Sequence, residues 1–533
     1  MRYDVVGLTL GSISGFLTIP LSIAFLVTLV FDAPTEISHA RACIAFLPAI
    51  LMALAIWHVL SRVIPDEQTN ARLRDREAFA SVALAWPLAV VIISIPMWLS
   101  GTFHGPGTSD WASGLVHSIF ESSSGVTTTG ATVIDATTSP RCNVGEDCLA
   151  SQLQGILLLR SASQWIGGMG VVMVGVFTLS NRFGGGMTLA RAELTGPTLE
   201  KLRPRMIGTA RVLWVTYLAF TLLAFLAYFA IPGLSFFEAV NHALTTAPTG
   251  GFSTSDASLS GTVSDAHIAT VEWVAIVLMF IAGFNMALLV MAWDQRSLAP
   301  LVQDEEARGY TVIVVTISTL VCLGVLLWTR SNTEEAPIRS GLFTVAAIVT
   351  STGYVAADYN AWPMAVRGLI LMLMITGASA GSTAGGVKIL RVLVAVKVAS
   401  RELRRLVNPR RVERIRMNDE FLEDEQVSLI IGMLMVWVLV FIVSCFIMAL
   451  LMPDLDLMAI ISVSLSAIGN TGPSMGMVGP TGTWSQLSPG AMIFTSLLMW
   501  AGRLELLTVL MLFVNLNLWR SEPRAGPPQN NVD

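Results

Sequence analysis

Four Thr-Gly pairs in this chain each follow a short apolar segment. Their glycines are separated by 120, 103 and 119 residues, which is nearly one fixed period. A period of this length indicates a repeated supersecondary unit. Four backbone segments that each follow a short helix are also what a fourfold ring of carbonyl oxygens around an ion requires. The pattern therefore predicts a cation-conducting pore built by one chain. The pairs are Thr129-Gly130, Thr249-Gly250, Thr352-Gly353 and Thr471-Gly472.

The composition indicates that lipid surrounds most of the chain. Hydrophobic residues make up 53% of the 533 residues and charged residues only 13%, whereas soluble domains carry about 25% charged residues. The apolar stretch that starts at Val5 is too long for the core of a signal peptide, so we expect it to remain as the first span. No cluster of Asp, Glu, His or Cys in the sequence lies near a span end, so we do not expect an enzyme.

Ten apolar segments are long enough to cross a membrane, which takes about 20 residues. Four shorter segments, near 112–127, 235–247, 339–350 and 456–468, each precede one Thr-Gly pair. We therefore expect an all-α polytopic membrane protein in which two introductory spans precede four units of span, short helix with loop, and span around one pore. The ten predicted spans lie near 5–31, 41–61, 78–100, 154–180, 207–231, 271–293, 310–329, 364–398, 425–452 and 489–519.

The predicted divisions of the chain follow from these segments. They are the two amino-terminal spans at 1–62, the four repeats at 63–205, 206–308, 309–416 and 417–520, and a disordered tail at 521–533.

Lys and Arg positions predict which side of the membrane each loop faces. The stretches 62–76, 182–211 and 388–416 are basic, and the last holds ten of the 32 Lys and Arg residues. The stretches 253–270 and 475–490 contain none. By the positive-inside rule, the basic loops and both termini are cytoplasmic and the Thr-Gly loops enter from outside. The short helices then direct the negative ends of their dipoles toward the pore centre, which favours a cation. Ordinary turns between packed helices are the alternative, and four copies in register argue against it.

Seven motifs give the chain a resemblance to TrkH, the pore-subunit family of Trk-type potassium uptake systems, which is grouped with KtrB subunits and with fungal and plant relatives. The resemblance runs nearly end to end. The motifs are SSGVTTTGAT, TTAPTGGFST and TSTGYVAADY around the first three pairs, QWIGGMG at 164–170, RAELTGPTLEKLRPR at 191–205, GASAGSTAGGVK at 377–388 and AGRLE at 501–505.

The resemblance implies a potassium filter at 127–131, 247–251, 350–354 and 469–473 that binds the ion mainly through backbone oxygens. Sodium-preferring relatives often carry serine at the first filter glycine, so Gly130 favours potassium. Pro248 and Pro473 lack an N–H donor, which leaves the hydrogen bonding behind the second and fourth segments open. The filter residues that the resemblance implies are Thr128, Thr129, Gly130, Thr249, Gly250, Thr352, Gly353, Thr471 and Gly472.

The run from Gly377 to Gly386 interrupts the span that begins near Met364. Small residues at this density either break a helix or allow close helix packing, and composition does not decide between them. A phosphate-binding loop is excluded because Val387 occupies the position of the required Lys. The resemblance implies an intramembrane gating loop beneath the filter. The gating residues it implies are Gly377, Gly381, Gly385, Gly386, Lys388 and Arg503.

Arg503 lies well inside the last predicted span, where an arginine usually faces a bundle interior or a water-filled cavity. A local pair with Glu505 is the alternative. The resemblance implies that Arg503 stands at the pore constriction as an electrostatic barrier. Glu121 and Asn241 each lie nine residues before a Thr-Gly glycine, so we expect them to be equivalent and to brace the filter from behind.

Cys142 and Cys148 lie in the polar stretch SPRCNVGEDC and are candidates for a disulfide if this loop faces an oxidising compartment. The residues alone leave this open.

The remaining predictions concern ion, partners and location. The basic, partly apolar stretch 397–416 favours contact with anionic lipids. The resemblance implies K⁺ as the transported ion, a ring of TrkA-type nucleotide-binding regulatory subunits on the cytoplasmic side, a homodimer and a bacterial inner membrane. We expect no nucleic-acid partner and no prosthetic group. A proton- or sodium-coupled secondary transporter is the alternative, although it usually needs mid-span acidic or His residues that are few here.

Overall fold

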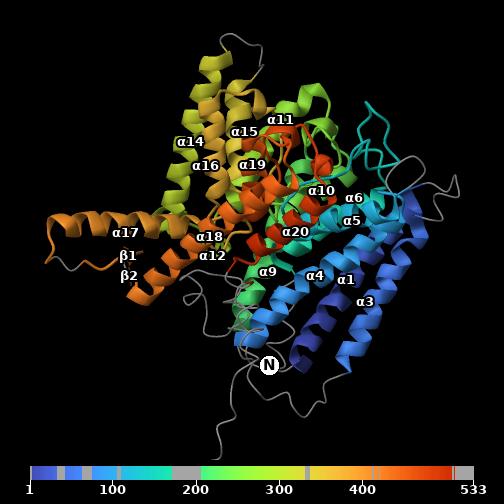
Figure 1. Cartoon of the computed structure of the whole chain (residues 1–533), viewed down its shortest axis with the longest axis horizontal. Coiled ribbons are helices and arrows are strands. Elements are labelled where there is room, and N and C mark those ends of the chain that lie inside the picture. The colour runs from blue at the N-terminus through green and yellow to red at the C-terminus, as the bar shows by residue number, and fades with distance from the viewer. Residues whose placement is uncertain are drawn as a thin grey trace, which may run out of the picture.

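The computed structural model describes residues 3–32, 42–62, 75–104, 110–170, 206–329, 336–410, 413–418, 420–506 and 509. These residues are mostly α-helical (Figure 1). Two short strands, β1 (Arg416–Met417) and β2 (Glu420–Phe421), pair as an antiparallel hairpin. The motif at 191–205, the ends of the predicted spans 154–180 and 489–519, and the predicted tail at 521–533 lie outside the described residues.

Seven helices within the described ranges are long and apolar enough to cross a membrane, which confirms the predicted all-α polytopic fold class. Six match predicted spans. The seventh is displaced from the predicted 271–293, because the helix breaks at Gly283 and a new one starts at Met286. The seven are α1 (Tyr3–Phe31), α3 (Phe46–Ser61), α4 (Asp75–Leu99), α9 (Met206–Phe229), α11 (Asp265–Ala282), α14 (Glu305–Thr329) and α18 (Asp424–Leu451).

The other three predicted spans are shorter or interrupted in the described residues. The segment 154–180 begins with α6 (Gln154–Trp165) and continues as the π-helix η2 (Ile166–Gly170). The segment 364–398 divides into α16 (Met364–Ile375) and α17 (Ile389–Val407), so it is not one continuous helix. The segment 489–519 begins with α20 (Pro489–Arg503). Minor helices are α12 (Met286–Asp294), α13 (Ala299–Gln303), η4 (Ser260–Thr262), η5 (Tyr359–Ala361), η6 (Gly476–Val478) and η7 (Trp484–Gln486).

The four short apolar segments form the four short helices α5 (Trp111–Val126), α10 (Phe236–Thr246), α15 (Pro337–Val349) and α19 (Leu457–Gly469). A capping residue or a first-turn proline marks the N-terminus of each helix. Asp110 and Asp456 accept N–H groups of the first turn, and Ser235 forms a capping box with Glu238. Pro337 is the first residue of α15, where its missing N–H has no cost.

Each short helix packs between a helix before it and a helix after it: α5 between α4 and α6, α10 between α9 and α11, α15 between α14 and α16, and α19 between α18 and α20. The long helices keep large apolar side chains exposed, including Leu439 and Phe446 on α18, which suits an outer surface in lipid. In Figure 1, α17 and the β-hairpin extend away from the helical body, and α1, α3 and α4 lie together on the opposite side.

Candidate ion pathway and intramembrane loop

The same unusual backbone conformation follows each short helix. A non-glycine residue adopts a positive φ, which is uncommon for a residue with a side chain. A glycine two positions later also adopts a positive φ. Four occurrences at matching places indicate one structural unit used four times. The pairs, with φ in degrees, are Thr128 (54) and Gly130 (84), Thr249 (57) and Gly251 (77), Ser351 (52) and Gly353 (76), and Asn470 (52) and Gly472 (95).

In the second segment this conformation begins at the threonine of the Thr-Gly pair, one residue later than in the other three segments. The N–H of Gly250 donates to Thr245 O at 2.8 Å, the same five-residue hydrogen bond that Thr129 makes to Ser124 and Thr471 makes to Ser466. Gly250 therefore corresponds to Thr129 and Thr471, and Gly251 corresponds to Gly130. The prediction aligned Gly250 with Gly130 by the letters Thr-Gly, whereas in the structure Gly251 has the second positive φ. On the same register His242, rather than Asn241, is equivalent to Glu121.

The four segments contact one another in a closed ring. A Cβ built on Gly130 would clash with the carbonyl oxygen of Gly250, and one on Gly251 would clash with that of Thr352. The remaining contacts are Gly353 with Thr471 O and Gly472 with Thr129 O, which return to the first segment. Only glycine allows backbone to approach backbone this closely.

A buried ion pair braces the first two segments. Arg160 Nε donates to Glu121 Oε1 at 2.8 Å, and both side chains are buried. Glu121 Oε2 also accepts the N–H of Val133 at 3.0 Å, and Arg160 Nη1 donates to Ser253 O at 3.2 Å. The placement of Glu121 behind its segment agrees with the bracing role expected for it. Arg160 was not singled out by sequence reasoning, although a charge inside an apolar span is a recognised signal.

Gln164 supplies hydrogen bonds behind the second segment, where Pro248 has no donor. Its amide Nε2 donates to Gly250 O at 2.7 Å, and its Oε1 accepts the N–H of Phe252 at 3.1 Å. Gln164 is the first residue of the motif QWIGGMG, but its role was not predicted.

Residues 376–388 join α16 to α17 and keep the name intramembrane loop from the prediction that the resemblance implies. Thr376 and Val387 form an isolated parallel bridge, so the two ends of the loop lie beside each other. The N–H of Gly377 donates to Val387 O at 2.8 Å, and that of Val387 donates to Ile375 O at 3.1 Å. Gly381 and Gly386 adopt positive φ values of 78° and 70°. The loop therefore doubles back on itself instead of continuing as a helix.

The intramembrane loop lies against the carboxyl ends of three short helices. Thr383 Oγ1 donates to Ala247 O at 3.1 Å, and Gly385 N–H donates to Ser351 Oγ at 2.6 Å. A Cβ on Gly385 would clash with Gly469 O. The small residues thus both interrupt the helix and allow close packing, the two explanations that composition left open.

Arg503 joins this loop to the first unit. Its Nη1 donates to Thr383 O at 2.7 Å, and its Nη2 donates to Gly168 O at 2.7 Å and to Gly167 O at 3.1 Å. Lys388 is buried and donates to Ala384 O within the loop. The guanidinium therefore bridges the end of α20, the π-helical segment after α6 and the loop.

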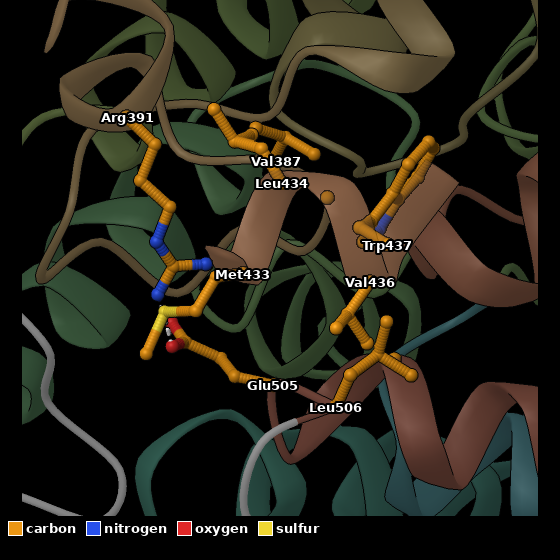
Figure 2. Close-up of a pocket in the computed structure, with 10 residues that line it drawn as sticks. Val387, Arg391, Met433, Leu434, Val436, Trp437, Glu505 and Leu506 are labelled. Atoms are coloured by element: carbon orange, nitrogen blue, oxygen red, sulfur yellow. Dashed lines mark hydrogen bonds and ion pairs between the residues drawn. The ribbon is translucent and has the colours of Figure 1, made fainter. Parts of the chain in front are cut away.

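A cavity lies beside the loop, between it, α18 and the end of α20 (Figure 2). In the wall of this cavity, Glu505 forms an ion pair with Arg391. The sequence alternative was a local pair of Glu505 with Arg503. The residues that line the cavity are Gly386, Val387, Arg391, Met433, Leu434, Val436, Trp437, Gly502, Glu505 and Leu506.

The loops on the other side of the ring are linked to one another. Cys142 and Cys148 form a disulfide in the structure, and Asp256 accepts the N–H groups of Cys148 at 2.7 Å and Leu149 at 3.1 Å. Burial raises the pKa of the Asp256 carboxyl, and the two backbone donors oppose this shift. Among the described residues, no group of three or more His, Cys, Asp or Glu side chains is arranged to hold a metal ion.

Comparison with known proteins decides the family. The TrkH family model, described as a cation transport protein, matches residues 46–520. This chain belongs to the TrkH family. It is 32% identical over 460 residues to the Trk system potassium uptake protein TrkH of Halomonas elongata, which covers 86% of this chain and 89% of that protein. The Escherichia coli K12 protein of the same name is 32% identical over 523 residues, or 97% of this chain and 98% of that protein.

The fold of this TrkH-family chain is similar to that of a solved relative. The crystal structure of the potassium transporter TrkH from Vibrio parahaemolyticus superposes with a TM-score of 0.78 at 25% identity, covering 96% of this chain and 98% of that one. The resemblance inferred from the motifs is confirmed, and with seven candidate spans among the described residues the chain is a multi-pass membrane protein.

Proposed function

We propose that this protein takes up potassium through a gated, channel-like pore. The observation that carries the proposal is the closed ring of four segments after the short helices, in which each glycine contacts the carbonyl oxygen of the next segment. A filter that replaces the hydration shell of K⁺ uses rings of backbone carbonyls in this way. The matching relatives are named as potassium uptake proteins, which supports the same ion.

The filter consists of Thr128-Thr129-Gly130, Thr249-Gly250-Gly251, Ser351-Thr352-Gly353 and Asn470-Thr471-Gly472. The carboxyl ends of α5, α10, α15 and α19 immediately precede these segments, and the negative ends of the helix dipoles favour a cation there.

The intramembrane loop is the gate of this pore. Its contacts with Ala247, Ser351 and Gly469 place it against the ends of the short helices, and Arg503 holds it there through Thr383. In the conducting state the loop moves away and the charge of Arg503 no longer opposes a passing cation. A small cavity next to α18 adjoins the loop.

The remaining assignments belong to the same proposal. The protein lies in a bacterial inner membrane as a homodimer with both termini in the cytoplasm, and the disulfide loop faces the oxidising side. A ring of TrkA-type nucleotide-binding subunits controls the gate from the cytoplasm. The basic residues of α17, including Arg401, Arg404 and Arg405, contact anionic lipids at that surface.

Reconstitution into liposomes tests the proposal against ion-coupled transport. Rubidium-86 uptake is measured with a potassium gradient alone, and then with a proton or sodium gradient imposed at a clamped membrane potential. A channel gives uptake that follows the potassium gradient and membrane potential only. Uptake against the potassium electrochemical gradient, driven by protons or sodium, would contradict the proposal.

A further inference from the structure

A buried carboxylate contacts both the intramembrane loop and the start of the helix that follows it. Glu306 lies in the first turn of α14 and is only 6% exposed. Its Oε1 accepts the N–H of Ala380 at 2.6 Å and the N–H of Leu390 at 3.1 Å. Ala380 belongs to the loop and Leu390 to the first turn of α17. One oxygen atom therefore connects these two parts of the chain.

Neither the N–H of Ala380 nor that of Leu390 has a carbonyl acceptor within a helix that could take the place of the Glu306 carboxylate. The first N–H groups of an α-helix have no acceptor within the helix, and this holds for Leu390. Ala380 lies in the non-helical loop. A buried backbone donor left without an acceptor is costly, so the loop and the start of α17 are held in position relative to α14 as long as Glu306 accepts from both.

The two residues before Glu306, Asp304 and Glu305, form contacts with α17 and with the β-hairpin. Asn418 Nδ2 donates to Asp304 Oδ2 at 2.6 Å, and the Asn418 Oδ1 accepts the N–H of Glu305 at 2.7 Å. Glu305 forms an ion pair with Lys397 of α17, whose Nζ also donates to Arg416 O at 2.6 Å. The segment 304–306 is thus bonded to the loop, to α17 and to the β-hairpin region at once.

We propose that Glu306 is a positioning residue of the gate: by accepting both N–H groups it holds the intramembrane loop beneath the ring of four segments, and it transmits displacements of α17 and the hairpin to that loop. The inference rests on the proposed function for its consequence in ion flow, but the position of the loop can be measured independently.

Three substitutions separate hydrogen bonding from charge and from packing. Glu306→Gln removes the charge but keeps an Oε1 that accepts both donors, so it behaves like the wild type. Glu306→Asp keeps the charge but withdraws the carboxylate by one methylene. Glu306→Ala removes the acceptor. Glu272→Ala is the matched control, because Glu272 is also a buried carboxylate on a span, but its ion pair at 2.5 Å is with Arg339 on α15.

The test measures loop exposure and ion flow in the same proteoliposomes. Ser382→Cys, a half-buried loop position, is added to each variant, and its rate of modification by a membrane-impermeant thiol reagent is measured after subtraction of the rate of the same variant without this cysteine. Rubidium-86 uptake is measured in parallel. Glu306→Ala is expected to raise the modification rate about three- to tenfold, the factor for losing the one hydrogen bond of the two that holds Ala380 of the loop. A smaller rise is expected for Glu306→Asp and none for Glu306→Gln or Glu272→Ala.

Each outcome decides the inference. The predicted order of modification rates supports it, and increased uptake in the same variants supports the gate as well. If modification increases while uptake stays constant, Glu306 positions the loop but the loop is not the gate, which contradicts the proposed function alone. An unchanged modification rate in Glu306→Ala overturns the inference, and so does a Glu306→Gln variant that behaves like Glu306→Ala. If Glu306→Ala is not recovered folded, Glu306→Asp and Glu306→Gln decide by the same criteria.

Discussion

The Cα of Gly251 lies against the carbonyl oxygen of Thr352, so closely that a Cβ on the glycine would clash with it. Gly251 also adopts a φ of 77°, which is strained for any residue with a side chain. Two independent constraints, one conformational and one steric, therefore require glycine at the contact between the second and third segments.

Substitution of the two adjacent glycines tests the register of the second segment. Gly251→Ala forces backbone to separate from backbone, and the positive φ alone costs about 1–2 kcal/mol. Gly250 has no positive φ, and a Cβ there meets the buried amide of Gln164 rather than backbone, so only that side chain and its two hydrogen bonds must shift. Gly251→Ala is therefore expected to reduce potassium selectivity or the melting temperature more than Gly250→Ala. Bi-ionic currents and thermal melts of both variants measure this. A larger effect of Gly250→Ala would support the equivalence of Gly250 with Gly130 that the Thr-Gly pairs predict.

The gate is tested at Gly385. Its Cβ would clash with Gly469 O at the end of α19, so Gly385→Ala is expected to displace the intramembrane loop and raise the open probability without changing the ion preferred. Single-channel recording in mixed potassium and sodium gives both quantities. A change in selectivity with constant open probability would assign this segment to the filter instead.

Arg503 is expected to restrain flow in two ways, through its charge and through its bond to Thr383 O. A bare positive charge 4 Å from a passing cation opposes it by about 4 kcal/mol at an effective dielectric of 20, and water in the pore lowers this value. Arg503→Ala should raise rubidium-86 uptake, and Arg503→Lys, which keeps the charge but loses the planar fork, should lie nearer the wild type.

Glu505→Gln is the matched variant for Arg503→Ala, because it removes the negative charge that pairs with Arg391 at the same end of α20. Equal loss of folded protein in Arg503→Ala and Glu505→Gln, without faster uptake in Arg503→Ala, would assign Arg503 a purely structural role.

The buried pair of Glu121 and Arg160 is expected to stabilise the fold around the first two segments. Glu121→Ala leaves a buried guanidinium without its carboxylate, which costs about 3–5 kcal/mol in comparable cases. Arg404→Ala is the control, since its ion pair with Glu413 is exposed and contributes about 0–1 kcal/mol. Thermal melts in detergent compare the two, and a similar small loss in both would show that the buried pair does not brace the ring.

Run length and small-residue density were enough to predict most of the architecture. The four short segments became α5, α10, α15 and α19, because an apolar run too short to cross can only end inside the protein. The break between α16 and α17 coincides with the run of small residues from Gly377 to Gly386, although composition left close helix packing as an equal alternative. The register of the second segment did not follow, because Thr249-Gly250-Gly251 offers two glycines and only the backbone conformation distinguishes them.

The contacts that connect distant parts of the chain also could not be predicted from the sequence. Gln164 bonds to Gly250, Arg503 to Gly167 and Gly168, and Glu306 to Ala380. No periodicity records which backbone group a buried side chain meets, because that depends on tertiary packing. A charged or amide side chain inside an apolar span indicates only that such a partner exists.

The reversal potential of Gly130→Ser under bi-ionic potassium and sodium conditions tests the central claim most directly, because it reports selectivity independently of the number of open pores. The wild type is predicted to prefer potassium. In Gly130→Ser the side chain must occupy space taken by Gly250 O at a φ of 84°, so the potassium preference is predicted to fall while size-exclusion profiles still show folded protein. An unchanged reversal potential in the folded variant would mean that the ring of four segments does not select the ion.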